Sequence, residues 1–204
     1  AVGLRASRGY RGGGVSYAAT IGATQEYDPE YAWEVELYGR TVVAGELTLA
    51  GGLFYTWLDD MQVPTHAEGG IPGIDTFVVN SARSHRYGAE VEVDWELVPG
   101  WHARAAVGYV ETGFDELSVF GIDRSGLRFP NAPGGTASAS VSYEDGDGPF
   151  CRLALSWADR SYSQIFNPSL TALESRTDLS ATVGWRHGAI KVYLFGENLL
   201  DEDY

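Results

Sequence analysis

Acidic side chains stand at every second position of one segment, at Glu90, Glu92, Asp94 and Glu96. Carboxylates can transfer protons or bind metal ions where two or more of them converge. Alternate residues of a β-strand share a face, but their Cβ atoms recur only every ~6.6–7 Å along it. We therefore predict a solvated acidic surface, with Arg104 opposite Asp94 as a structural ion pair, and no catalytic site.

The other residue types with chemical potential are scattered. The glycine-rich segment 11–14 lacks the Lys-Ser/Thr ending and the following helix of a phosphate loop. The serines lie outside any G-x-S-x-G context. No histidines have the spacing of metal ligands; they stand at His66, His85, His102 and His187. We expect no enzyme activity, no metal site and no cofactor.

The composition excludes several classes of protein. Of 204 residues, 28 are Asp or Glu and 14 are Lys or Arg, and the resulting charge of −14 argues against a nucleic-acid partner. The single cysteine, Cys151, cannot form an internal disulfide or a zinc quartet. A hydrophobic share of 44% argues against disorder. The longest nearly uncharged run, 42–58, is too short and interrupted for a membrane-spanning helix.

Apolar and polar residues alternate along the whole chain, which predicts strands rather than helices. The connections alternate between short turns of two to five residues and long loops of ten to twenty residues. In an up-and-down antiparallel sheet, this order places all the short turns at one end and all the long loops at the other. Nine strands are predicted, over residues 2–10, 31–40, 45–62, 75–97, 101–114, 135–144, 150–162, 173–186 and 189–196.

Two turns predict the strand register. The Val-Pro-Gly turn after the acidic strand keeps Asp94 opposite Arg104. A two-residue loop over 187–188 places Arg186 opposite Ala189. Both hairpins then set apolar residues against apolar ones, and a slip of one residue would move one strand's apolar set to the other face.

One face of the predicted sheet carries no charge in the eight strands after the first, and it holds all six tryptophans. The opposite face carries twelve charged residues: Glu34, Glu36, Glu46, Glu90, Glu92, Asp94, Glu96, Arg104, Arg152, Asp178, Arg186 and Lys191.

The uncharged face has two interpretations. One is the core of a soluble β-sandwich that binds a ligand or a carbohydrate. The other is the lipid-facing surface of an outer-membrane β-barrel, whose periplasmic turns are short and whose extracellular loops are long. Several predicted strands reach the ~9–11 residues needed to cross a bilayer. The aromatic residues Trp95, Trp101, Tyr143 and Trp185 lie near the short turns, as in an interfacial girdle. We favour an all-β, partial transmembrane barrel of about nine strands.

Six segments resemble, in order, motifs of TonB-dependent outer-membrane receptors. Segment 5–14 is similar to their A-S-R-G-Y-R-x-G-G strand-into-loop motif, and 53–62 is similar to their F-Y-x-d-w-x-D-m-Q strand. The six segments read RASRGYRGGG (5–14), YDPEYAWEVE (27–36), LFYTWLDDMQ (53–62), RYGAEVE (86–92), PNAP (130–133) and FGENLLDEDY (195–204).

The resemblance implies a receptor of the Gram-negative outer membrane that contacts outer-membrane lipid and imports a ferric siderophore or another scarce nutrient. Such transporters have 22 strands and a plugged lumen. We expect residues 1–204 to be a C-terminal segment of this barrel, without the plug domain, the TonB box through which the TonB complex acts, or the last strand. A barrel enzyme is disfavoured because no nucleophile constellation is present.

The resemblance also implies that ligand contacts come from the long loops and the adjacent barrel wall. Arginine and aromatic side chains suit an anionic, partly aromatic ferric chelate. The candidate ligand-binding residues are Tyr10, Arg11, Asp59, Asp60, Phe120, Arg124, Arg160 and Tyr162.

Overall fold

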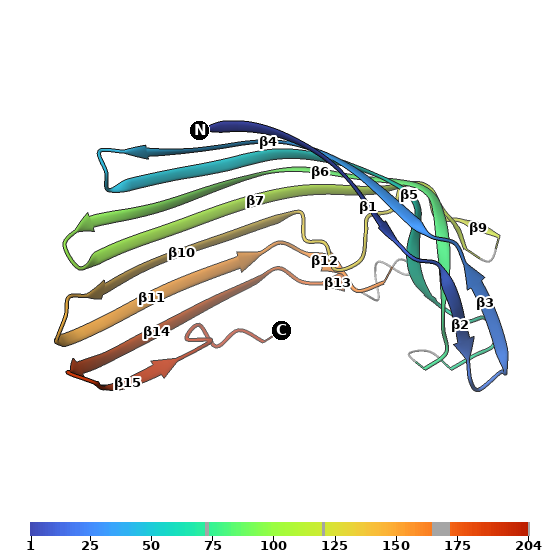
Figure 1. The fold of residues 1–204 in the computed structure, drawn as a ribbon. Coiled ribbons are helices and arrows are strands. Elements are labelled where there is room, and N and C mark those ends of the chain that lie inside the picture. Colours follow the sequence, from blue (N-terminus) through green and yellow to red (C-terminus); the bar gives the residue numbers. More distant parts are fainter. Residues whose placement is uncertain (72–73, 120, 165–171, 204) are drawn as a thin grey trace.

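The computed structural model describes residues 1–71, 74–119, 121–164 and 172–203, and these form a single curved layer of long strands (Figure 1). Nine antiparallel strands make one sheet in the order β1-β4-β5-β6-β7-β10-β11-β14-β15, so each long strand pairs with the next one along the chain. This confirms the predicted all-β, up-and-down architecture. The nine are β1 (Val2–Arg11), β4 (Glu30–Val43), β5 (Leu47–His66), β6 (Thr76–Val98), β7 (Trp101–Glu116), β10 (Gly135–Glu144), β11 (Gly148–Ala158), β14 (Arg176–His187) and β15 (Ile190–Gly196).

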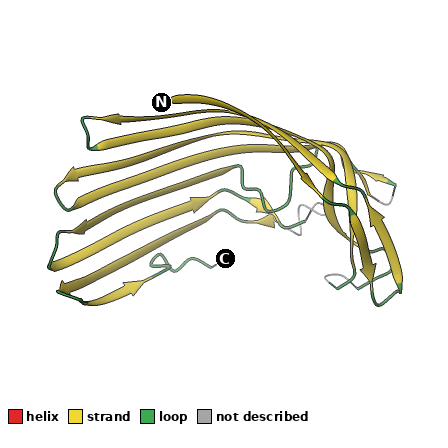
Figure 2. Cartoon of the chain, viewed as in Figure 1, coloured by secondary structure: helices red, strands yellow, loops and turns green. Residues whose placement is uncertain are grey.

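The two ends of the sheet differ as predicted. Four short connections, over 44–46, 99–100, 145–147 and 188–189, lie together at the left of Figure 1. The long connections gather at the opposite end, and three of them contain small hairpins that the sequence did not reveal (Figure 2). These hairpins pair β2 (Gly14–Ala18) with β3 (Ala23–Tyr27), β8 (Ser118–Val119) with β9 (Ile122–Asp123), and β12 (Ser161–Tyr162) with β13 (Ala172–Leu173). Within the described residues, no helix is long and apolar enough to cross a membrane.

The predicted register is confirmed in one hairpin and wrong by two residues in the other. Asp94 pairs with Arg104, as expected, although the connection consists of residues 99–100 and a register shift between Glu96 and Val98 replaces the predicted three-residue loop. Between β14 and β15, however, Arg186 pairs with Lys191 rather than with Ala189, because the loop consists of residues 188–189. Gly188 has a φ of 57°, a conformation that a two-residue hairpin turn requires and that glycine adopts without strain. A shift of two residues leaves every side chain on its predicted face.

Several predicted strand ends were wrong by three or four residues. The strand predicted over 31–40 runs to Val43, the one over 45–62 runs to His66, and the one over 173–186 begins at Arg176. The strand predicted over 150–162 ends at Ala158, and pairing resumes only in the small β12. The Asp159 carboxylate accepts a hydrogen bond from the Arg160 backbone N–H at 2.7 Å. Such a local bond turns the chain away from the sheet, because it satisfies a donor that a ladder would otherwise use.

The uncharged face of the sheet is exposed. All six tryptophans are between 38% and 58% exposed, among them Trp95, Trp157 and Trp185. In a β-sandwich these three would be packed between two sheets. The described residues form a single long-stranded sheet that leaves this face open, so the sandwich interpretation is wrong.

The buried apolar residues gather at the loop end of the molecule. One cluster joins the loop-side ends of β5 and β7 to the segment after β7; its buried members are Leu58, Val63, Phe114, Leu117, Val119 and Phe129. A smaller cluster packs Ala18 of the β2–β3 hairpin against Ala67 and Phe77. The hydrophobic core of this chain therefore supports its loops.

Candidate functional site

The charged face of the sheet, hereafter the polar wall, is organised by ion pairs between neighbouring strands. Arg5 of β1 lies 3.2 Å from Glu34 and 2.8 Å from Glu36, both of β4. Glu34 also pairs with Arg86 of β6 at 3.1 Å and accepts a hydrogen bond from the Thr56 hydroxyl at 3.0 Å. Four adjacent strands are thus linked through one carboxylate.

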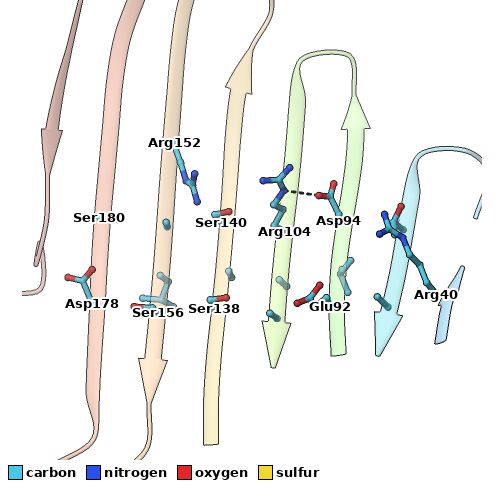
Figure 3. Close-up of a pocket in the computed structure, with 18 residues that line it drawn as sticks. Arg40, Glu92, Asp94, Arg104, Ser138, Ser140, Arg152, Ser156, Asp178 and Ser180 are labelled. Carbon is cyan, nitrogen blue, oxygen red and sulfur yellow. Dashed lines mark hydrogen bonds and ion pairs between the residues drawn. The ribbon is translucent and has the colours of Figure 1, made fainter. Parts of the chain in front are cut away.

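A hollow of about 560 Å³ lies further along the polar wall, towards the short turns (Figure 3). Its floor is made of small side chains, including Ser138, Ser140 and Ser156, and charged residues border it. Arg104 donates to Asp94 at 2.7 Å, which confirms the predicted pair. This volume falls in the range of small-molecule pockets, ~300–1,000 Å³.

Within the described residues, no group of three or more His, Cys, Asp or Glu side chains could hold a metal ion. The acidic residues of β6 follow the strand alternation, and Asp94 is held by Arg104. The wall can therefore attract, repel or orient a charged solute, and its carboxylates do not converge on a reacting centre.

Two of the predicted ligand residues lie on the apolar side of the sheet. Tyr10 is 78% exposed, and its ring centroid is 6.5 Å from that of Tyr31. Tyr31 in turn pairs with Asp59, so the structure brings Tyr10 and Asp59 into one row across β1, β4 and β5. By strand alternation this row continues the face of Trp33 and Trp57, away from the polar wall.

Other predicted ligand residues lie on separate strand ends and loops. Arg11 ends β1 opposite Glu30, and alternation places it on the side of the polar wall. Arg160 forms an exposed ion pair with Glu174 at 2.8 Å.

Arg124 and Tyr162 also support loop structure through their backbones. The Arg124 N–H donates to the Leu117 carbonyl at 2.8 Å, and the Tyr162 carbonyl accepts from the Asn131 N–H at 2.7 Å. Phe120 lies outside the described residues. The described members of the predicted set do not form one cluster.

Asp60, the last predicted ligand residue, belongs to a hydrogen-bond network at the loop end of the polar wall, hereafter the Gln62 network. Gln62, 4% exposed, donates from its side-chain amide to the Gly12 carbonyl at 2.9 Å and to the Asp28 carbonyl at 3.1 Å. The Asn80 amide donates to the Asp60 carbonyl at 2.7 Å and to the Asp28 carbonyl at 3.0 Å. Asp60 itself has a φ of 55°, which marks an irregularity in β5.

The Gln62 network gives a structural role to residues of three sequence motifs. Gly12, Asp28 and Gln62 come from the first three motif segments, which lie up to fifty residues apart. Glu30, of the second segment, completes it by accepting the Gln62 backbone N–H at 2.8 Å. The motifs alone do not show that these residues bond to each other, because the bonds join separate segments of the chain.

Asp75 is a second anchor that sequence reasoning missed. It is completely buried and accepts hydrogen bonds from the hydroxyl and the backbone N–H of Thr20 and from the Ile71 N–H at 2.8 Å. These bonds, led by that of the Thr20 hydroxyl, hold the pKa of the Asp75 carboxyl below its usual value. The carboxylate thereby ties the β2–β3 hairpin to the loop between β5 and β6. No motif surrounds Asp75, so no sequence signal pointed to it.

Comparisons with known proteins bear on this arrangement. The family described as TonB dependent receptor-like, beta-barrel, matches residues 2–199. The chain belongs to the TonB-dependent receptor family. Members of this family are outer-membrane receptors and transporters of Gram-negative bacteria rather than enzymes, which agrees with the expected localisation and absence of catalysis.

Solved structures of such receptors share this fold at low sequence identity. The ferric yersiniabactin uptake receptor FyuA from Yersinia pestis matches with a TM-score of 0.78 and 23% identity over 98% of this chain and 30% of that one. The siderophore receptor PiuA from Acinetobacter baumannii matches with a TM-score of 0.69 and 17% identity over 98% and 30%. The copper transporter OprC matches with a TM-score of 0.66 and 15% identity over 87% and 26%. The chain therefore spans about a third or less of these receptors, and curated proteins gave no match.

Membership in a TonB-dependent receptor barrel assigns the two faces. The exposed apolar face contacts lipid and the polar wall lines the lumen. Trp57 pairs with His85, and Trp95 follows His85 by ten residues along β6. Trp57 and Trp95 thus mark two levels that are ten residues apart along the strands. At ~3.4 Å per residue and a strand tilt near ~40°, the two levels are about 26 Å apart along the membrane normal, close to the ~25 Å height of the apolar band in such barrels.

Proposed function

We propose that the complete receptor imports a ferric siderophore, or another scarce nutrient of similar size, and that residues 1–204 form a C-terminal part of its barrel. The observation that carries the proposal is the polar wall beneath long, internally packed loops. The polar wall offers a hydrated route lined by charges of both signs and by small serine side chains. The names of FyuA and PiuA, a ferric yersiniabactin uptake receptor and a siderophore receptor, support iron chelates as the cargo.

Capture of the ligand would begin at the loop end. Arg11, Arg124, Arg160 and Tyr162 remain the proposed contacts there, since guanidinium groups and aromatic rings bind anionic and aromatic parts of a chelate. Arg160 is exposed and pairs with Glu174 at 2.8 Å, and a stronger anion can displace a weak surface pair of this kind.

Release into the periplasm would depend on the TonB complex. In the proposed mechanism, a plug domain elsewhere in the receptor is rearranged by TonB, which draws on the inner-membrane proton gradient. The barrel segment contributes binding and a lining, and no covalent bond of the cargo is made or broken.

A growth assay tests the proposal. A strain lacking the complete receptor is grown under iron limitation with single ferric siderophores and is complemented with the wild type or with Arg160→Gln. We expect one siderophore whose use requires the receptor and an active TonB complex. Direct titration of the purified receptor with that siderophore, with and without iron, checks binding. Growth that is independent of the receptor on all ferric siderophores, together with no binding, would refute the iron-chelate cargo.

A further inference from the structure

Residues 121–129, hereafter the roof, fold back over the loop end of the polar wall. Phe129 donates its backbone N–H to the Thr112 hydroxyl at 3.0 Å, and its ring packs on that of Phe114. Thr112 pairs with Arg86, whose guanidinium belongs to the polar wall, and strand alternation places Phe114 on the same face. Thr112 is only 5% exposed. The roof therefore covers the loop end of the polar wall on β5 to β7.

Beneath the roof, the wall on β4 to β6 is narrowed by large side chains. The Phe54 ring lies over Gly88, where an added Cβ would be 2.7 Å from the ring carbon Cζ. One row closer to the loops, an ion pair at 3.1 Å joins Glu34 of β4 to Arg86 of β6. A hollow of about 380 Å³ beside Glu90 lies on the turn side of these groups. In the described part of the chain, the large side chains and the roof separate this hollow from the loop end.

The wall on β7, β10, β11 and β14 is built of small side chains instead. Its hollow of about 560 Å³ (Figure 3) shares Ser138, Ser156 and Asp178 with a second hollow of about 520 Å³. The second hollow extends to Ala158 and Arg176, which are the loop-side ends of β11 and β14. The two hollows thus form one continuous groove along the strands, centred on Ser138 and Ser156 and hereafter called the serine groove.

We propose that the serine groove is the transit site of the cargo, along which a ferric chelate passes from the loop end towards the periplasm once the plug has rearranged. The inference rests on the proposed function and adds which half of the lumen wall the cargo touches. Each hollow has the volume of a small-molecule pocket. A transit site must bind its cargo weakly enough to release it. The groove is bordered by charges of both signs, among them Arg152, Glu92 and Asp178, so it holds neither sign of cargo charge tightly.

Whole-cell uptake of a radiolabelled ferric siderophore measures passage, and binding to cells without a proton gradient measures capture. In the complete receptor, Ser138→Trp fills the serine groove. Gly52→Trp is the control, because it adds the same bulk on the polar face of β5, where the nearest contact of an added Cβ is an ordinary 3.6 Å. We expect Ser138→Trp to lower the rate of uptake at least about ten-fold, equivalent to about 1.4 kcal/mol in the barrier to passage, with unchanged capture. Gly52→Trp should leave the rate within about a factor of two.

Cysteine labelling shows when the groove opens. In a Cys151→Ser background, Ser138→Cys and Gly52→Cys are treated with a membrane-impermeant maleimide, and heat-dependent gel migration confirms that each variant is folded. We expect Ser138→Cys to react faster only when the ferric siderophore and an energised TonB complex are both present. Gly52→Cys should react at the same rate under all conditions.

The outcomes separate this transit site from the identity of the cargo. Equal uptake by the wild type and Ser138→Trp, or equal losses in Ser138→Trp and Gly52→Trp, would overturn the transit site and leave the iron-chelate cargo intact. If Ser138→Cys reacts at one rate with and without cargo, the groove is a fixed socket of the plug domain or permanently open to water, and the transit site is again overturned. A wild type that neither binds nor takes up any ferric siderophore would refute the cargo, and the transit site with it.

Discussion

The membrane-spanning part of the sheet and its loop end are stabilised in opposite ways. In the spanning part, large apolar side chains such as Leu53, Val107 and Val183 point outward and remain exposed on the protein itself. At the loop end, Val63, Phe114 and Val119 are at most 2% exposed and pack against each other. The loop end is therefore built like a small water-soluble domain, whereas the spanning part depends on lipid to cover its apolar surface. Substitutions should have different costs in the two regions.

Truncating the loop core should have the largest effect. Phe114 is 1% exposed, and its ring centroid lies 4.8 Å from that of Phe129. Phe114→Ala should lower the free energy of opening the loop end by about 3–5 kcal/mol, because it leaves a cavity. Hydrogen exchange of the amides around 114–129 in the complete receptor measures this. Val107→Ala, on the lipid-facing side of the same strand, is the control and should cost about 0.5 kcal/mol. Equal costs would remove the contrast between the regions.

A charge on the lipid-facing side should have the next largest effect. Val107 is 60% exposed and pairs with Val91 and Ala137 on the lipid-facing side, in the middle of the sheet. Val107→Arg should cost about 2–4 kcal/mol, as expected for a cation near the bilayer midplane. Ala106→Arg, one residue away on the polar wall, should cost clearly less. Denaturant unfolding of the receptor in lipid bilayers compares the two variants. A greater cost for Ala106→Arg would contradict the assignment of the faces.

Disrupting the Gln62 network should have an intermediate effect on the stability of the loop end. Gln62→Ala removes the buried side-chain amide that donates to the Gly12 and Asp28 carbonyls, and the loss of two hydrogen bonds should cost about 1–3 kcal/mol. Faster hydrogen exchange in the segments 12–14 and 28–30 should report the loss. Gln25→Ala serves as the control, because the exposed side-chain amide of Gln25 donates to the carbonyl of the adjacent Glu26 and joins no other segment in the described structure. If the amides of both variants exchange at wild-type rates, the Gln62 network does not stabilise the loops.

The smallest effect should depend on pH. The lowered pKa of Asp75 means that its carboxylate stabilises the loop contact fully above about pH 3.9, the ordinary aspartate value. This contribution is lost as the pH falls through the lower pKa of the folded state. Protease cleavage of the β2–β3 hairpin should therefore increase at acidic pH in the wild type. In Asp75→Asn it should be raised already at neutral pH and vary little with acidification. Identical pH profiles would show that Asp75 does not anchor the hairpin.

The strands and their faces were predictable because they rest on local patterns. Alternation alone places Glu92 and Asp94 on one face and Trp95 on the other, and the turn before Trp101 sets the Asp94–Arg104 pair. The β14–β15 register was wrong by two residues because Gly188 fits either position of a two-residue loop in the sequence.

The loop end was not predictable for a physical reason. Its contacts join residues far apart in the chain, such as Gln62 to Gly12 and Thr20 to Asp75, and no periodicity reveals such pairs. Tyr10 illustrates the limit. Its place beside a long loop predicts a ligand contact. Its position on the lipid-facing side follows only from its pairing with Tyr31.

The central claim is that one face of this sheet contacts lipid and the other contacts water. Spin labels on β7 of the complete receptor in bilayers test it directly, in a Cys151→Ser background, at Ala103, Ala105 and Val107 on one face and at His102 and Ala106 on the other. We expect the first three labels to be accessible to oxygen and shielded from a water-soluble nickel complex, and the other two to show the reverse, with a period of two residues. Equal access of the nickel complex to both sets would contradict the assignment of the apolar face to lipid.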